Sequence, residues 1–329
     1  MSFEQLQQFS NLDLICGQNN LIVMKWLHTL GEASHQLCLK SSKPLQIRGQ
    51  VLTPTAPLIE LDRVLKMQRQ MMQSNCAFPL TTLPNEFIVN KGASFLVSKM
   101  HQIVMQNSWF DILGINQHPD KQAIHSSLNQ LWNEIRGYSI SVEAESDVNK
   151  RKKLISDQAK ENSRIVNRLL TQHANISSTK LFYCFCAKGD TASLQVNELE
   201  KAIVKLKSKL IDQFQQLNQG NLFCIQWRIQ KTLYGQYYLN MLVYHEQNHQ
   251  LQLPQDQNLL SHSIDKEGQI SVQLNLPNIS IQTLKLERDN FQGINLAEWK
   301  VIFNNMLYPL KYYYYQSKVI KSNFEYIVY

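Results

Sequence analysis

The carboxy-terminal part of the chain concentrates tyrosines among lysines. The run Tyr312 to Tyr315 is preceded by Lys311 and followed by Lys318 and Lys321. Aromatic rings can stack on exposed bases while lysines contact phosphates, which is how many proteins hold single-stranded nucleic acid. The alternative is structural, because a tyrosine ring also packs readily in a protein core.

A second pattern with metal chemistry lies nearby. His245-Glu246-Gln247-Asn248-His249 has the spacing His-Glu-x-x-His. On a helix the two histidines would share one face and bind zinc, and Glu246 would act as the general base of a peptidase. The preceding residues, 237–244, are rich in aromatic and β-favouring residues, so the pattern falls where a strand should turn. A zinc-dependent peptidase and a polar turn with ordinary surface histidines are the two alternatives.

Hydrophobic periodicity predicts the elements that must position these residues. The helix over 196–217 is the clearest, because apolar residues step by three, four or seven positions while Lys201, Lys205 and Lys209 recur on the opposite face. The loop 231–235 is short enough for an antiparallel hairpin. Further helices are expected over about 120–136, 151–172 and 296–318, and strands over 181–187, 222–230 and 236–244. The fold class is therefore α+β, with a carboxy-terminal antiparallel sheet, packed helices and a mainly helical amino-terminal region.

A change of composition marks a candidate domain boundary. Between Ser141 and Lys153 the chain turns polar and charged, and it ends in the basic run 149–153. Such a segment is typical of a solvated linker, and it is also a candidate phosphate contact. We therefore expect an amino-terminal region of unknown role over 1–148 and a carboxy-terminal domain over 149–329.

Length and charge set broader bounds. The 329 residues exceed one ordinary compact domain, and the formal net charge of +7 modestly favours a polyanionic partner. The six cysteines lack the spacing of a disulfide framework or a zinc knuckle, which fits reduced thiols. The sequence begins without a basic-then-apolar signal and has no run of roughly 18 apolar residues. We expect a cytoplasmic protein with no membrane partner.

From about residue 150 the predicted order of strand, helix, strand, strand and terminal helix is similar to the YagK/YfjJ family. It also resembles the inovirus-type replication initiators of the rolling-circle HUH class, found in phages and other mobile elements. In that class a strand ending in Trp-x-Arg-Glu-like residues precedes a Gly-x-His-x-His strand and a Tyr-x-x-Lys helix. Here 227–230 resembles the first motif, with its arginine one place early and Gln230 in place of the acid. Gly235 to Val243 resembles the second motif and 315–318 the third.

The resemblance implies phosphodiester chemistry. Two histidines on one strand face would hold a divalent ion that polarises the scissile phosphate, and a tyrosine hydroxyl would attack phosphorus. The expected histidine positions match Tyr237 and Leu239, and leucine cannot bind a metal. Standard metal-dependent nicking is therefore expected to be lost or altered, and binding is the function that would remain. A plain core hairpin is the structural alternative.

The resemblance also selects the candidate nucleophile. Both Tyr308-x-x-Lys311 and Tyr315-x-x-Lys318 have the required spacing. Tyr315 is preferred, because Pro309 would disturb a helix that continues through the first match.

Taken together, these patterns predict a nucleic-acid-binding protein that resembles a phage or plasmid replication initiator, with DNA, single-stranded or hairpin, as its partner. Whether it is an enzyme stays open. We expect no cofactor and no bound metal ion. Alternatives are the zinc-dependent peptidase and a scaffold whose amino-terminal half binds a protein partner. The candidate site residues are Tyr315 for catalysis and, for contacts to nucleic acid, Arg228, Lys231, Lys311 and Lys318.

Overall fold

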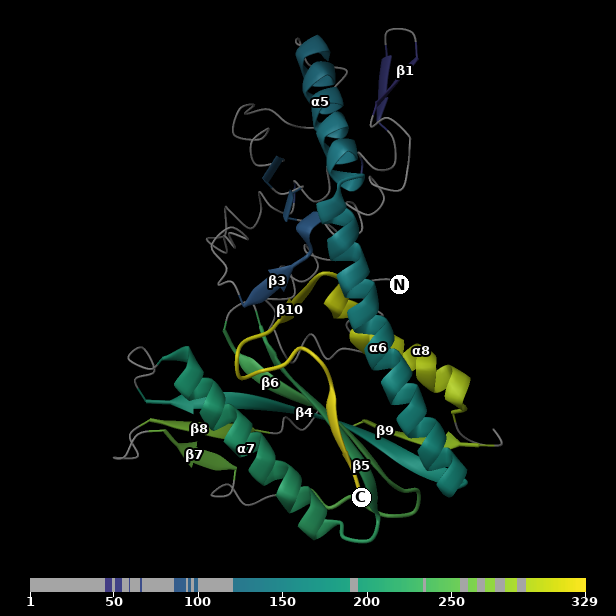
Figure 1. Ribbon diagram of the computed structural model, residues 1–329, viewed down its shortest axis with the longest axis vertical. Helices are drawn as coiled ribbons and strands as arrows, with labels where there is room; N and C mark the ends of the chain where they lie inside the picture. Colours follow the sequence, from purple (N-terminus) through teal and green to yellow (C-terminus); the bar gives the residue numbers. More distant parts are fainter. Residues whose placement is uncertain are drawn as a thin grey trace.

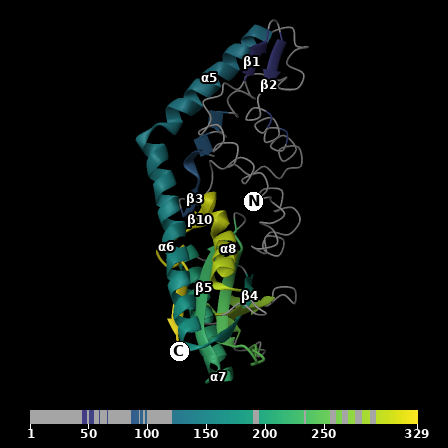
Figure 2. The ribbon, with the colours of Figure 1, turned by 90° about the vertical axis from the view of Figure 1, so that its right-hand side faces the viewer.

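The structure is a computed structural model that describes the following residues: 45–48, 51–54, 59, 66, 86–92, 94–95, 98–99, 121–189, 195–232, 235–254, 260–264, 270–275, 282–288 and 294–329. Two helices, α5 (Lys121–Ser139) and α6 (Val142–Gln172), follow each other along the long axis of the molecule (Figure 1). The chain bends between them (Figure 2). α6 begins there because the Ser141 side chain accepts a hydrogen bond from the Ala144 N–H, and Glu143 and Glu145 favour the positive end of the helix.

The main sheet is antiparallel throughout, and its longest strand, β4 (Asn175–Lys188), is central. One edge of β4 pairs with β6 (Tyr237–Glu246). The other edge is shared, since β9 (Gln282–Glu287) pairs with the first half of β4 and β8 (Ser271–Asn275) with its end. The full order is β11-β5-β6-β4-β8-β7, with β9 beside β4; the remaining strands are β5 (Leu222–Lys231), β7 (Ser261–Ser263) and β11 (Glu325–Val328).

The predicted hairpin of β5 and β6 is present. Trp227 lies opposite Met241 in an antiparallel register. The connecting turn contains Gly235 at a φ of 89°, a conformation that residues with a Cβ rarely adopt. The sheet and its helices agree with the expected α+β class, and the likeness to a replication initiator stays a prediction.

Helices cover both faces of the sheet. Residues alternate between the two faces along a strand. On β6, Tyr237 donates a hydrogen bond to Glu200 of α7 (Val196–Leu217), so this set of residues faces α7. Its neighbours in the other set face α6, because Asn162 of α6 donates to the hydroxyl of Tyr244.

The core between α6 and the sheet is closed by a third helix, α8 (Leu296–Leu307). Trp299 and Phe303 of α8 are buried there among aliphatic residues of α6 and the strands. The Trp299 indole N–H donates to Asn162, so the one polar group of this large side chain has a hydrogen-bond partner inside the core. α8 is therefore fixed along α6, and the two helices are neighbours on one face of the sheet.

The carboxy-terminal helix is shorter than expected, and the prediction of a helix over 296–318 was wrong in its second half. α8 ends at Leu307 and is followed by a 3-10 turn, η4 (Tyr308–Lys311), and then by strand β10 (Tyr313–Tyr315). Pro309 has no N–H to continue an α-helix, which accounts for the change of conformation here. β10 pairs with β3 (Phe87–Val89), and a separate hairpin is formed by β1 (Leu45–Arg48) and β2 (Val51–Pro54).

The expected linker is helical. The boundary proposed between residues 148 and 149 falls inside α6, and the basic run 149–153 belongs to that helix. Most of the amino-terminal region of 1–148 lies outside the described residues, so its expected helical character is not addressed. In the part of the chain that the structure describes, no helix combines the length and apolar content needed to cross a membrane.

Candidate functional site

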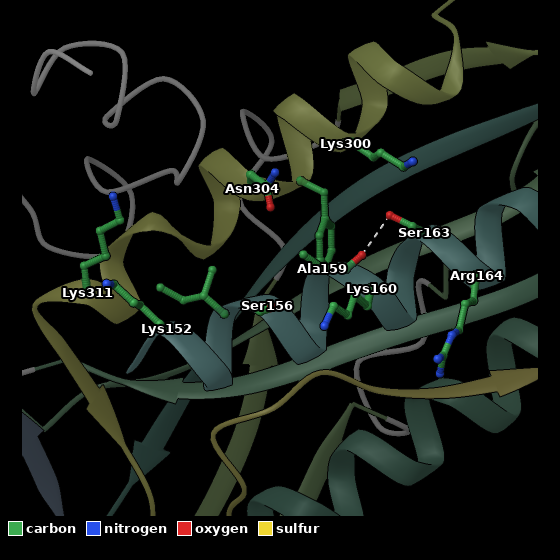
Figure 3. A pocket seen from close by; sticks show the side chains of 11 residues that line it. Lys152, Ser156, Ala159, Lys160, Ser163, Arg164, Lys300, Asn304 and Lys311 are labelled. Carbon is green, nitrogen blue, oxygen red and sulfur yellow. Dashed lines mark hydrogen bonds between the residues drawn. The ribbon is translucent and has the colours of Figure 1, made fainter. Parts of the chain in front are cut away.

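A basic groove runs between α6 and the segment formed by α8 and η4. Figure 3 shows the side chains that line it, with α6 as one wall and α8 with η4 as the other. Lys152, Lys160 and Arg164 belong to the α6 wall, and Lys300 and Lys311 belong to the opposite wall. The groove has a volume of about 750 Å³ and is open to solvent.

Small side chains on α6 make this groove. Ser156, Ala159 and Ser163 line it at spacings of three and four residues, which places them on one helix face. The Ser163 hydroxyl donates to the carbonyl of Ala159 at 2.8 Å, a bond within the helix. Phe303 of α8 also lines the groove and is itself buried. The α6 surface in the groove thus consists of short, uncharged side chains, and the longer lysine and arginine side chains surround it.

The electrostatic character of the groove is one-sided. Among the described residues, its lining contains five basic side chains and no carboxylate. The nearby Glu161 faces β11, where it accepts a hydrogen bond from the Tyr326 hydroxyl, and it also contacts Arg164 at 3.3 Å. Lys160 and Lys300 form no ion pair with any residue in the described ranges. The positive charge is therefore largely uncompensated, which favours binding of an anionic ligand.

A buried arginine fixes the wall that carries Lys311. Arg151 of α6 donates from Nη1 to the carbonyl of Leu310 at 3.0 Å and from Nη2 to the carbonyl of Ile88 at 3.3 Å. Its Nε donates to Asp147 at 3.1 Å, and Asp147 also accepts from the Lys91 N–H. The planar guanidinium, with donors in a fixed arrangement, thus joins α6, η4 and β3.

Tyr315, the predicted nucleophile, lies in a different place. It is on β10 and only 4% exposed, and its hydroxyl donates to Glu200 of α7. Glu200 is fully buried and also accepts from the hydroxyls of Tyr237 and Ser317. Burial, followed by the hydrogen bond to Glu200, raises the pKa of Tyr315. The phenolate that would attack phosphorus is therefore disfavoured, and the ring is covered.

Tyr237, whose position in the sequence matches a metal ligand of the HUH class, lies next to Tyr315. The centres of the two rings are 6.0 Å apart. However, burial raises the pKa of Tyr237, and Leu239 on the same strand face is fully buried. No group of three or more histidine, cysteine, aspartate or glutamate side chains suited to a metal is found within the described residues.

Lys231 is enclosed by aromatic rings. Its Nζ lies 4.5 Å from the ring centre of Tyr237, 4.9 Å from that of Tyr315 and 5.9 Å from that of Phe87. Cation–π attraction holds an ammonium group in such a position. Burial lowers the pKa of Lys231, while Glu200 acts in the opposite direction. The ammonium group of Lys231 thus links β5 to β3 and β10 through these ring contacts. It lies on the α7 face of the sheet, away from the groove between α6 and α8.

The structure does not support Arg228 as a surface contact to phosphate. Its side chain is 2% exposed and its guanidinium stacks 4.7 Å from the ring of Phe324. Burial lowers the pKa of Arg228 to about 10. Arg228 directly follows Trp227 on β5, and successive side chains of a strand point to opposite faces of the sheet. Arg228 therefore points to the α6 side, into the interior.

Of the predicted contacts, the groove contains Lys311 alone. Lys318 is exposed in the turn after β10 and is not part of the groove lining. The residues that sequence reasoning missed are Lys160, Arg164 and Lys300, while Lys152 was included only as part of a basic run. A signal for the α6 wall was present, because Lys152, Ser156, Lys160 and Arg164 recur every fourth residue of a predicted helix.

The His-Glu-x-x-His pattern has no helical geometry here. His245 and Glu246 are the last residues of β6, and a turn follows. The His245 ring contacts Thr179 and the carbonyl of Glu246, and the His249 ring contacts Asn218. Both histidines therefore anchor the strand end through hydrogen bonds.

Comparison with known proteins gives no relative for this geometry. No family model, curated protein or solved structure matches the chain.

Proposed function

We propose that this protein binds nucleic acid and holds the phosphate backbone in the groove between α6 and α8. The observation that carries the proposal is the lining itself, which in the part of the chain that the structure describes has five basic residues and no carboxylate. Lysine and arginine side chains that neutralise phosphates release counterions, which is the main source of sequence-independent affinity for nucleic acid. DNA, single-stranded or in a hairpin, is the proposed partner.

The resemblance to phage and plasmid replication initiators belongs to the same proposal. It is supported by the antiparallel sheet with helices on both faces and by the neighbouring positions of Tyr237 and Tyr315. Catalysis by Tyr315 has less support, because its hydroxyl is buried and bonded to Glu200. We therefore propose binding without standard metal-dependent nicking.

The first prediction concerns the salt dependence of binding. If all five basic residues of the groove contact phosphates, log K should fall with log salt at a slope of about −3.5 for a single strand. Replacing Lys160 and Lys300 by glutamine should weaken the slope by about 1.4, since each lost contact removes about 0.7. Fluorescence anisotropy with a labelled hairpin and a labelled single strand, over a salt series, measures both quantities.

A matched control comes from the opposite face of the sheet. Lys205 and Lys209 of α7 are exposed, and their replacement by glutamine removes the same charge away from the groove. This control should leave the salt slope unchanged. Equal losses in the two double variants would contradict the assignment to the groove, and absence of binding at low salt would contradict the function.

A further inference from the structure

We propose that the groove binds a linear chain of phosphates without reading bases, so that inorganic polyphosphate is a ligand of the same site. This inference rests on the proposed function and names the chemical feature that the site recognises. Its basis is the kind of side chain in the lining and the way the charges are arranged along the two walls.

The first observation is that no exposed aromatic ring lines the groove among the described residues; the nearby Tyr308 ring is half-buried and lies 4.3 Å from the ammonium group of Lys311. Binding of single strands through their bases uses exposed aromatic rings. The aromatic side chain in the described lining is Phe303, which is 1% exposed and packs against Phe324 and Trp299. Its ring is therefore occupied within the core. Of the tyrosine run that the sequence offered for stacking, Tyr312, Tyr313 and Tyr315 are buried, while Tyr314 is half-buried with the guanidinium of Arg151 5.3 Å from its ring centre.

The second observation concerns groups that could read base edges. Sequence readout depends mainly on arginine, asparagine and glutamine making paired hydrogen bonds to a base. Arg164 already contacts Glu161, and Asn304 is the one amide side chain in the described lining. The other polar residues of the lining are serines and lysines, which suit phosphate oxygens without selecting a base.

The third observation is the spacing of the charges. Lys152, Lys160 and Arg164 lie along one face of α6, and the twelve steps from first to last cover about 18 Å of helix. A phosphate chain that ran along this wall would meet these three positive charges one after another. Lys300 and Lys311 stand on the other wall, so a phosphate chain lying in the groove would be neutralised from both sides (Figure 3).

Competition separates recognition of phosphate from recognition of bases. The full chain is bound to labelled oligothymidylate and titrated with inorganic polyphosphate or with unlabelled oligothymidylate, oligocytidylate and oligoadenylate at matched phosphate concentration. We expect all four competitors to act within about threefold of one another, because counterion release depends on charge. K160Q/K300Q should weaken binding of every ligand in parallel, and K205Q/K209Q should weaken none.

Two results would overturn the inference while leaving nucleic-acid binding intact. One is binding of oligothymidylate that polyphosphate does not reverse at about a hundredfold excess of phosphate. The other is a difference of more than about tenfold among the three oligonucleotides, which corresponds to at least one base-specific contact. Failure of every ligand to bind at low salt would instead overturn both the inference and the proposed function.

Discussion

At the scale of single residues, identity and position do not determine what a side chain can do. Tyr315 has the spacing to Lys318 that a tyrosine nucleophile would need, and its ring lies beside that of Tyr237. Its surroundings give it another role. With Tyr237 and Ser317 it supplies hydroxyl donors to the buried Glu200, and so it attaches β10 and the following turn to α7.

The Tyr315→Phe variant tests this structural role. It removes a hydrogen bond to a buried carboxylate and should lower the free energy of unfolding by about 1.5–3 kcal/mol. Binding of nucleic acid at a temperature where the variant is folded should be unchanged. Urea denaturation measures the loss, and Tyr326→Phe is the matched control, because that hydroxyl meets Glu161 at the exposed surface. Unfolding at the same urea concentration in wild type and Tyr315→Phe would rule the role out.

At the scale of elements, the groove depends on how α6 holds its neighbours. The packing of Trp299 and Phe303 holds α8 beside α6. Arg151 holds η4 in place by its hydrogen bond to the carbonyl of Leu310. Arg151 forms an ion pair with Asp147 that is buried on both sides. Such a pair contributes little net stability, but breaking it leaves an unpaired charge in the interior.

The Arg151→Met variant should therefore lower the free energy of unfolding by about 3–5 kcal/mol. The double variant Arg151→Met/Asp147→Leu removes both charges and should recover part of that loss, because no carboxylate stays buried without its partner. Chemical denaturation of the three proteins gives the comparison. If the double variant were less stable than Arg151→Met, the ion pair would not be the source of the effect.

At the scale of the whole molecule, most basic side chains among the described residues are exposed or half-buried, yet Lys180 of β4 is enclosed near α8. It is 7% exposed and lines a small cavity together with Leu242, Leu284 and Trp299. Burial lowers the pKa of Lys180 to about 8, against 10.5 for an ordinary lysine. Between these two values the unfolded chain binds the proton more strongly than the folded chain, so this group makes stability rise as the pH rises.

The Lys180→Met variant isolates this contribution. Wild type should gain up to about 1.4 kcal/mol per pH unit from Lys180 between pH 8 and 10.5, and the variant should lack this gain. Burial raises the pKa of Cys184 to about 11 and that of Cys224 to about 12, which acts in the opposite direction in both proteins. The measurement is therefore the difference in unfolding free energy between wild type and variant across this range. A constant difference would contradict an enclosed lysine.

The sequence by itself determined the elements whose signals are local. The predictions of helix α7 and of the hairpin of β5 and β6 were close to the structure. The signals for both, the hydrophobic periodicity and the turn at Gly235, depend on residues that are near one another in the sequence. Pro309 also carries a local signal, because it cannot continue the helix expected to reach residue 318, and α8 ends at Leu307. The α6 wall of the groove was visible as a repeat of four residues.

Only the tertiary structure decided which of these residues form a site. Lys300 and Lys311 complete the groove because Trp299 and Phe303 pack α8 onto α6, a contact between segments far apart in the sequence. Arg228 and Lys231 are close neighbours on β5, but their side chains point to opposite faces of the sheet. Arg228 is buried in the interior, and Lys231 is enclosed by aromatic rings. Local pattern determines which way a strand or helix presents a side chain, whereas exposure to a ligand depends on what the rest of the chain packs against that face.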